Sequence, residues 1–387
     1  MKKAVQFGAG NIGRGFIAQL LSESGFEVVF ADVVDAVVEN INARHTYSIR
    51  YAAPGSPTTW VKNVRAVNSK VPENAAREIA DADLMCTAVG VNVLPYVAPV
   101  IALGIKARYD AGVTEPINII ICENLQHMGA FLKGEVKKHL DESLYGYLDE
   151  KVGFVESVVG RMVPVMTPEQ KAEDPLLSIV EPYKHLPVAK SMIKGDFPEI
   201  AGIEPKDIFQ GYVDRKLYTH NAGHAAAAYL GNLKGYTYIY EAMRDPEVAA
   251  TVREIMNETG EGLIKKHGLD RAEHMAHIDD LIERFGNVAL ADTVKRVGGD
   301  PLRKLRHEDR LVGGALLARE YGVFPKAMCK AIAAALVFNP EGDPTAAQVQ
   351  SLIAEKGAKA AFCEISGVDE GDSIVDEIMK NYNNIKS

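Results

Sequence analysis

Along the first third of the chain, short apolar runs alternate with segments in which apolar residues recur at helical spacing. Residues 3–7 are an apolar run that ends at a group of glycines, residues 11–24 have helical periodicity, and residues 26–31 are a second apolar run. This order predicts a β-α-β unit. Residues 84–89 and 117–122 are further apolar runs, as strands buried on both faces of a parallel sheet require. We therefore expect a Rossmann-type, doubly wound α/β domain at the N-terminus.

Two further stretches of this half alternate between apolar and polar residues. Residues 47–51 and 60–67 flank the Pro-Gly-Ser-Pro sequence at 54–57, which predicts a β-hairpin inserted into the helical rhythm. Residues 151–165 alternate again, and a segment punctuated by prolines follows them. We expect these stretches to close the first half of the chain.

The second half of the chain is helical in pattern. We divide the chain near residue 195 into a dinucleotide-binding Rossmann-type domain, residues 1–195, and a mainly α-helical substrate and catalytic domain, residues 196–387. Ligand sites often lie between domains, so we expect the chemistry in the cleft between these two. Helical spacing of apolar residues marks the stretches 207–231, 246–267, 271–285, 308–320, 325–337, 345–356 and 369–383.

Composition and charge narrow the class of protein. The chain has 387 residues, of which 47% are hydrophobic and 25% charged, which suits two packed soluble domains. The net charge of −9 argues against a nucleic-acid or anionic membrane partner, because repulsion opposes encounter. An anionic substrate would therefore need a local basic patch. We expect a small-molecule substrate and a monomer or small homo-oligomer.

Cysteine usage and hydropathy indicate a cytoplasmic protein. The four cysteines, Cys86, Cys122, Cys329 and Cys363, are widely separated and show no zinc-ligand spacing, so we expect reduced thiols and no metal site. The first residues do not fit a secretory signal. The longest apolar run, residues 93–105, spans 13 residues with two prolines, short of the ~20 that cross a bilayer.

The glycines at residues 8–13 and the acidic residue at the end of the next strand predict an NAD site. In Gly8-x-Gly10-x-x-Gly13 the first glycine makes a tight turn, the second lets the backbone approach a pyrophosphate, and the third packs helix against strand. Asp32 suits the ribose hydroxyls and repels a 2′-phosphate, which favours NAD over NADP. The alternatives are a glycine turn without a ligand and an acid that only caps a strand. The expected cofactor contacts are Ala4, Val5, Gln6, Phe7, Gly8, Ala9, Gly10, Asn11, Ile12, Gly13, Arg14, Gly15, Asp32, Val89, Gly90 and Glu123.

The stretch Lys216-Leu-Tyr-Thr-His-Asn221-Ala-Gly-His224 brings an amine, an amide and an imidazole together. In an α-helix at ~100° per residue, Asn221 and His224 are neighbours and Lys216 lies ~140° and ~80° from them, so all three can face one cavity. Oxidation of a secondary alcohol needs a base, a hydride acceptor and oxyanion stabilisation.

We assign Lys216 as the base, if burial lowers its pKa, and Asn221 as the oxyanion donor. Asn124 would be a second donor from the other domain, and His224 would orient Lys216 or a substrate hydroxyl. Taken singly, each has a purely structural alternative. Gly223 and the alanines at 225–228 favour the functional interpretation, because they make this helix narrow, as in a packed interior.

The chain resembles the mannitol-1-phosphate 5-dehydrogenases, a group within the polyol-specific long-chain dehydrogenase family. The resemblance implies metal-independent, NAD-linked interconversion of D-mannitol 1-phosphate and D-fructose 6-phosphate, with Lys216 as general acid/base and Asn221 as oxyanion donor. One departure is Gly160, where an acidic residue is expected before Arg161. The residues that carry the resemblance are 7–16 with 30–32, 123–124, 153–157, 215–224 with 229–231, and 296–298 with 301–305.

A basic segment offers a site for the phosphate. Residues 295–310 carry a local excess of positive charge, and arginine suits phosphate oxygens. Arg303 and Arg310 are our candidates, against the alternative of a solvated basic surface. Two other functions stay open: a dehydrogenase of a non-phosphorylated polyol or uronate, and a non-catalytic NAD-binding regulator. The intact Lys216, Asn221 and His224 argue against the regulator.

Overall fold

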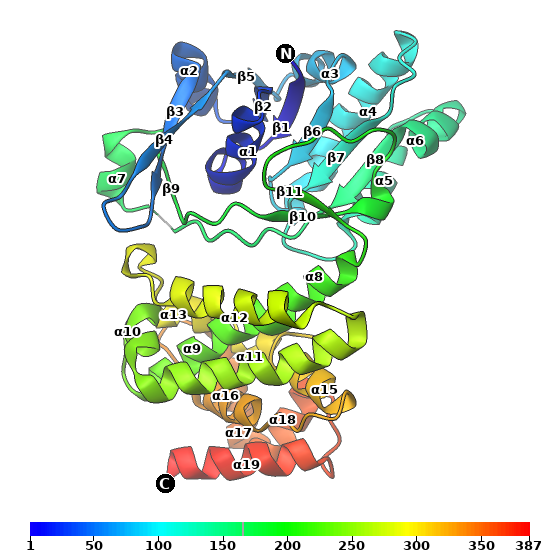
Figure 1. Ribbon diagram of the computed structural model, residues 1–387. Coiled ribbons are helices and arrows are strands. Elements are labelled where there is room, and N and C mark those ends of the chain that lie inside the picture. Colours follow the sequence, from blue (N-terminus) through cyan, green and yellow to red (C-terminus); the bar gives the residue numbers. More distant parts are fainter. Residues whose placement is uncertain (165) are drawn as a thin grey trace. The chain divides into compact units, whose positions relative to one another are not determined.

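The structure is a computed structural model that describes residues 1–164 and 166–387 and forms two compact units, Met1–Phe209 and Gln210–Ser387. The elements of each unit are shown in Figure 1. Strands β10 (Leu186–Ala189) and β11 (Ile203–Lys206) pair in parallel and hold residues 196–209 with the first unit, whereas the sequence pattern placed the boundary near residue 195. Residue 165, the last of the expected alternating stretch 151–165, lies outside the described residues.

The first unit is built on a six-stranded parallel sheet in the order β5-β2-β1-β6-β7-β8. This is the strand order of the Rossmann fold, so the expected fold class is confirmed. The order reverses between β1 and β6, and ligands of such sheets bind beyond the carboxyl ends of the strands at this point. The strands are β1 (Lys3–Phe7), β2 (Glu27–Asp32), β5 (Val64–Asn68), β6 (Leu84–Thr87), β7 (Ile117–Ile121) and β8 (Val152–Glu156).

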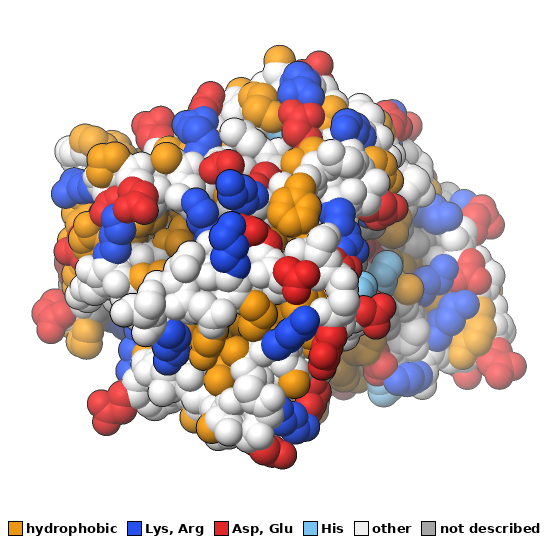
Figure 2. Space-filling view, turned by 90° about the horizontal axis from the view of Figure 1, so that it is seen from below, with side chains coloured by type: hydrophobic (Ala, Val, Ile, Leu, Met, Phe, Trp, Pro, Cys, Tyr) orange, Lys and Arg blue, Asp and Glu red, His pale blue; other side chains and the backbone are white. Residues whose placement is uncertain are grey.

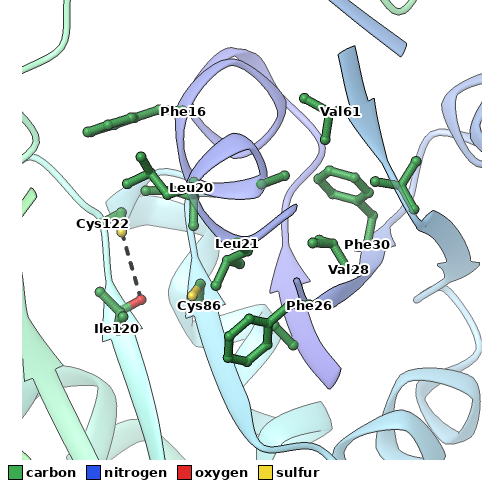
Figure 3. Packing of buried hydrophobic residues seen from close by; sticks show 14 of the residues in the cluster. Phe16, Leu20, Leu21, Phe26, Val28, Phe30, Val61, Cys86, Ile120 and Cys122 are labelled. Atoms are coloured by element: carbon green, nitrogen blue, oxygen red, sulfur yellow. Dashed lines mark hydrogen bonds between the residues drawn. The ribbon is translucent and has the colours of Figure 1, made fainter. Parts of the chain in front are cut away.

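Helices cover both faces of this sheet, because its strands are apolar on both sides. On one face, Phe16, Leu20 and Leu21 pack on Phe30 and other strand residues in one core cluster (Figure 3). A second cluster fills the other face. The described helices of the unit are η1 (Gly13–Ile17), α1 (Ala18–Glu23), α2 (Asp35–Arg44), α3 (Pro72–Ala80), η2 (Val91–Val93), α4 (Leu94–Asp110), α5 (Met128–Lys137), η3 (Glu142–Leu144), α6 (Tyr145–Lys151), α7 (Pro168–Glu173) and η4 (Lys190–Met192).

The expected hairpin is present, but its second strand is shorter than the pattern indicated. Strands β3 (Thr46–Tyr51) and β4 (Thr58–Lys62) are antiparallel, and β9 (Ser178–Val180) joins β3 in parallel to make a three-stranded sheet. The prediction of one strand over residues 60–67 was wrong. Asn63 adopts a left-handed backbone with φ 57°, which redirects the chain, and the following residues become β5 at the edge of the main sheet.

The helical segment Val91–Asp110 has the length and hydropathy of a membrane-spanning helix, although the uninterrupted apolar run inside it covers only residues 93–105. In the structure its residues Leu94, Ile101 and Ile105 are fully buried in the second core cluster of the first unit. The same length and composition occur in core helices of soluble proteins, and this helix has the packing of a core helix.

The second unit is helical, as expected. Its narrow helix α9 is buried by close contacts, since a Cβ at Gly223 would lie 2.7 Å from the sulfur of Met256. Tyr229 on the same helix donates a hydrogen bond of 2.8 Å to the carbonyl of Gly298. The described helices of this part of the chain are α8 (Phe209–Arg215), η5 (Lys216–Asn221), α9 (Ala222–Leu233), α10 (Ile239–Arg244), α11 (Pro246–His267), α12 (Arg271–Phe285), η6 (Val288–Leu290), α13 (Val294–Gly298), α14 (Pro301–Lys304), α15 (Val312–Glu320), α16 (Lys326–Val337), α17 (Pro344–Lys356), α18 (Ala358–Ser366) and α19 (Ser373–Lys386).

The four cysteines are free, and one face of the surface carries charges of both signs. Cys86, Cys122 and Cys329 are free and buried, and Cys363 is free and half-buried, as expected for reduced cysteines. On the face shown in Figure 2, lysine and arginine side chains are interspersed with aspartate and glutamate side chains.

Candidate functional site

The turn between β1 and η1 has the conformation of a dinucleotide cradle. Gly8 has φ 87°, and a Cβ there would lie 2.5 Å from the carbonyl oxygen of Ala88. A Cβ at Gly13 would lie 2.0 Å from the carbonyl oxygen of Gly8. A Cβ at Gly10, in contrast, would meet no atom within 4 Å. The first and third glycines are therefore needed by the fold, whereas the second keeps a space open beside the backbone, and this space fits a pyrophosphate.

Asp32 is fixed at the carboxyl end of β2, next to this turn. Its Oδ2 accepts a hydrogen bond of 2.6 Å from the amide of Ala9, and its Oδ1 accepts one of 2.9 Å from the amide of Val34. The carboxylate is thus oriented by backbone donors on both sides. A carboxylate in this position accepts from ribose hydroxyls and disfavours a 2′-phosphate.

Glu123 connects the ends of β6 and β7. Its two carboxylate oxygens accept hydrogen bonds from the amides of Val89, at 3.0 Å, and Gly90, at 2.8 Å, and the side chain is buried. It therefore shapes the loop after β6. Gly90 has φ 92° with open space around it, and Asn124 is exposed in the loop after β7.

Two buried arginines support the helix that follows the glycine turn. Arg14 Nη1 donates to the carbonyl of Ala9, and burial lowers the pKa of Arg14. Arg161 Nη1 donates hydrogen bonds of 2.7 Å to the carbonyl of Gly15 and to Gln19 Oε1. Burial lowers the pKa of Arg161 to about 10.

The Tyr183 ring occupies the space beside residue 160. A Cβ at Gly160 would lie 3.1 Å from Cε1 of that ring, so a larger side chain would displace it. The Arg161 guanidinium contacts a carbonyl oxygen and an amide oxygen, and the Phe16 ring lies 5.0 Å away. The charges of Glu181 and Glu23 also act on it. The glycine before Arg161 is thus explained by packing against Tyr183.

The predicted catalytic segment is not a regular α-helix. Residues Lys216–Asn221 form the π-helix η5, which connects α8 to α9. The separation of ~140° between Lys216 and Asn221 was therefore wrong, because a π-helix pairs residues five positions apart. The wider turn places these two side chains closer in direction. Another π-helix, η1, lies at the glycine turn of the first unit, and π-helical turns are frequent at functional sites.

Lys216 is half-buried, and its amine differs from that of a surface lysine. Burial lowers the pKa of Lys216 to about 8, and the positive charge of Arg310 acts in the same direction. Arg310 and Lys216 belong to the same unit, so this effect does not depend on the first unit. At neutral pH the amine is thus close to the range in which a general acid/base works well.

His224 is held between an aromatic ring and a carboxylate. Its imidazole stacks on the Phe285 ring, with 4.8 Å between the ring centroids and an interplanar angle of 9°. The centroid of the His220 ring lies 6.4 Å from that of His224. His224 Nε2 lies 3.4 Å from Oδ2 of Asp292. Analysis of the sequence missed Asp292, which is far from His224 along the chain and belongs to no recognised motif.

Two arginines of the basic segment 295–310 form ion pairs with acids of the same segment. Arg303 Nε pairs with Asp300 at 2.8 Å, and Arg310 Nε pairs with Asp309 at the same distance. Lys304 is buried and donates from Nζ to a backbone carbonyl. Burial lowers its pKa to about 8, and the charge of Arg310 contributes second. The charge of Arg310 thus acts on both lysines. The charge of Arg303 also acts on Lys304, and the Arg303 side chain is about half exposed.

The structure brings Lys216, Asn221 and His224 together on the continuous run of η5 and α9, with Arg310 in the same unit. Asn124, Asp32 and the glycine turn belong to the first unit. Among residues 1–164 and 166–387, no group of three or more His, Cys, Asp or Glu side chains is arranged to hold a metal ion.

Two solved structures of known dehydrogenases are similar to this chain. The structure is similar to a D-sorbitol dehydrogenase in substrate-free form, with a TM-score of 0.84 and 18% sequence identity over 99% of this chain and 93% of that chain. It is also similar to Pseudomonas fluorescens mannitol 2-dehydrogenase in a ternary complex with NAD and D-mannitol, with a TM-score of 0.73 and 16% identity over 100% and 92% of the two chains.

Matches to two family domains cover nearly the whole chain. Residues 2–202 match the mannitol dehydrogenase Rossmann domain, and residues 209–386 match the mannitol dehydrogenase C-terminal domain. The two matches follow the order of the two compact units. The chain therefore belongs to the mannitol dehydrogenase family.

Proposed function

We propose that this polyol dehydrogenase interconverts D-mannitol 1-phosphate and D-fructose 6-phosphate with NAD and without a metal ion. The observation that carries the chemistry is Lys216, a half-buried amine at the start of a π-helix, with a pKa lowered to about 8. The choice of NAD over NADP rests on the oriented carboxylate of Asp32. The choice of a phosphorylated substrate rests on Arg310, whose charge acts on Lys216.

Each residue of the catalytic segment has a defined task in this reaction. When bound, NAD⁺ would supply the hydride acceptor for oxidation of the carbon that carries the reacting hydroxyl. The residues that would hold it are the glycine turn at 8–13 and Asp32. Lys216, in its neutral form, takes the proton of the reacting hydroxyl, and in the reverse direction its ammonium returns that proton. The side-chain NH₂ of Asn221 donates to the same oxygen as negative charge develops, and Asn124 is our candidate for a second donor.

Arg310 is the better of the two phosphate candidates. Its side chain is more buried than that of Arg303, and its charge reaches Lys216 and Lys304. A guanidinium offers several donors in a plane and can bind a phosphate while one nitrogen keeps its bond to Asp309. The substrate would then be oriented by its phosphate end and react at the Lys216 end.

The decisive experiment measures NADH oxidation by the purified, chelator-treated protein with fructose 6-phosphate and, separately, with fructose at equal concentration. Turnover of only the phosphorylated sugar supports the proposal. Turnover of fructose alone shows a dehydrogenase of a free polyol, and turnover of neither overturns the assignment. Activity that disappears on chelation and returns with a divalent ion would refute the metal-independent mechanism.

Two variants of the basic segment test whether Arg310 binds the substrate phosphate. Arg310→Gln should raise KM for fructose 6-phosphate about 10- to 100-fold, since a hydrogen bond between charged groups contributes about 1.5–3 kcal/mol. Arg306→Gln removes an equal charge from an exposed position of the same segment and should leave KM nearly unchanged. Equal effects in both variants would indicate a general electrostatic attraction and not a phosphate site.

A further inference from the structure

Asp292 lies in the connection between η6 and α13 and is held there by its backbone carbonyl and by one carboxylate oxygen. Its backbone carbonyl accepts a hydrogen bond of 2.9 Å from the amide of Ile239. Its Oδ1 pairs with Nη2 of Arg296, one helical turn later. The neighbouring Thr293 caps α13 by accepting from the amide of Arg296 at 3.2 Å. These bonds leave Oδ2 directed at His224, with Nε2 at 3.4 Å.

The carboxylate is mostly buried and yet ionised. The side chain of Asp292 is only 13% exposed. Burial by itself would raise the pKa of Asp292, but the contacts with His224 and Arg296 outweigh burial, and the pKa lies below its usual value. An ionised carboxylate can only accept hydrogen bonds. The nitrogen of His224 that faces this acceptor is Nε2, so an N–H at Nε2 is the complementary arrangement.

We propose that Asp292, held by Arg296, is a positioning residue that fixes the tautomer and the plane of the His224 imidazole. The inference rests on the proposed function, because it gives His224 a task in polyol binding. With hydrogen on Nε2, Nδ1 of a neutral imidazole is an acceptor. Phe285, stacked on the ring, limits its rotation. Nδ1 is thereby prepared to accept a hydrogen bond from a hydroxyl of the substrate.

The isosteric change Asp292→Asn tests this arrangement by activity. The amide NH₂ would replace an acceptor by a donor opposite Nε2 and favour the other tautomer. We expect kcat/KM to fall about 10- to 100-fold, the size of effect known for partners that orient metal-ligating histidines, with NADH affinity unchanged. Asp292→Glu retains the carboxylate and should recover part of the activity.

A matched control separates positioning from stability. Asp245 has the same exposed fraction, 13%, also pairs with a cation, Lys234, and lies in the same unit. Asp245→Asn should lower the free energy of unfolding, because it removes the ion pair with Lys234 and a negative charge at the N-terminus of α11, and should leave kcat/KM close to the wild-type value. If both variants lose kcat/KM in proportion to their stability, Asp292 is merely structural and the proposal falls.

Nitrogen NMR of histidine-labelled protein gives a readout that needs no substrate. The signals of His224 are assigned by their loss in His224→Gln. In the wild type we expect the tautomer with hydrogen on Nε2, and in Asp292→Asn the tautomer with hydrogen on Nδ1. The opposite tautomer in the wild type, or no change in the variant, overturns the inference. A protein that turns over neither sugar but shows the expected tautomers would refute the proposed substrate and keep the positioning role.

Discussion

Lys216 and Asn221 are the first and last residues of one π-helical segment, five positions apart. A π-helix pairs residues at this spacing, so the two side chains point in more similar directions than they would in an α-helix. The α-helix resumes at Ala222 and carries His224 on its first turn. The proposed catalytic arrangement thus depends on a local change of helix type.

Replacement of Lys216 by methionine should remove acid/base catalysis and keep the shape of the segment. We expect kcat to fall about 10²- to 10⁴-fold, the usual contribution of a general acid/base. NADH binding, measured by fluorescence titration, should be unchanged, because the glycine turn and Asp32 lie in the other unit. A variant with near-normal kcat at every pH would exclude Lys216 as the acid/base.

The pH dependence of the two directions should be opposite. Oxidation needs the neutral amine, so kcat/KM should rise with pH and level off above a pKa of about 8. Reduction needs the ammonium, so kcat/KM should be level below this pKa and fall above it. Arg310→Gln removes a positive charge that lowers the pKa of Lys216, and both profiles should move to higher pH. Profiles that do not move would show that burial alone determines this pKa.

The glycine turn allows cofactor binding and folding to be separated by two matched substitutions. Gly10→Ala adds a methyl group to open space, so unfolding free energy should change by less than about 0.5 kcal/mol. The same methyl group should weaken NADH binding about tenfold or more. Gly13→Ala places a Cβ 2.0 Å from a carbonyl oxygen and should destabilise the protein by about 1–3 kcal/mol. Urea unfolding and NADH titration of both variants check these expectations.

Glu258 should make stability depend on pH in an unusual direction. It accepts hydrogen bonds from the amides of Ala327, at 2.7 Å, and Met328, at 3.0 Å, at the start of α16. Burial nevertheless raises the pKa of Glu258 to about 7. Between its unfolded pKa near 4.5 and about 7, the folded state binds more protons than the unfolded state. The contribution of this group to stability is therefore complete below about 4.5 and is lost as pH rises to about 7.

Glu258→Gln isolates this effect, because glutamine does not titrate. The difference in unfolding free energy, wild type minus variant, should decrease by about 3 kcal/mol as pH rises through this window. Above this pH window the difference should be constant. A difference that grows with pH would show that the two hydrogen bonds from the backbone amides outweigh the effect of burial on the pKa of Glu258 and keep its carboxylate ionised.

The parallel sheet and most helices of the second unit followed from the sequence, because buried strands and amphipathic helices leave a periodic pattern. The redirection at Asn63 did not, since the sequence alternates without a break across it. The π-helix at Lys216–Asn221 was missed because α- and π-helices are built from the same residue types. Short helices such as α13 (Val294–Gly298) and α14 (Pro301–Lys304) contain too few residues to show a period.

The candidate site was predictable where it consists of local motifs. Lys216, Asn221 and His224 are adjacent in sequence, and so are the residues of the glycine turn. Asp292 was not predictable, because its relation to His224 arises only when α13 packs against α9. The excess charge of residues 295–310 was visible, but the ion pairs of Arg303 and Arg310 depend on side-chain direction.

The three-stranded sheet has a consequence for the order of folding. β9 pairs with β3, so that Ile179 meets Arg50 only after the intervening chain has been brought together. A contact between residues so distant in sequence closes a long loop, so we expect it to form late, after the main sheet has shortened the path. The ion pair between Arg50 and Glu173 joins the same two parts of the chain. Removal of this ion pair should accelerate unfolding and leave the refolding rate almost unaltered, so the contacts at this edge should lengthen the lifetime of the folded first unit.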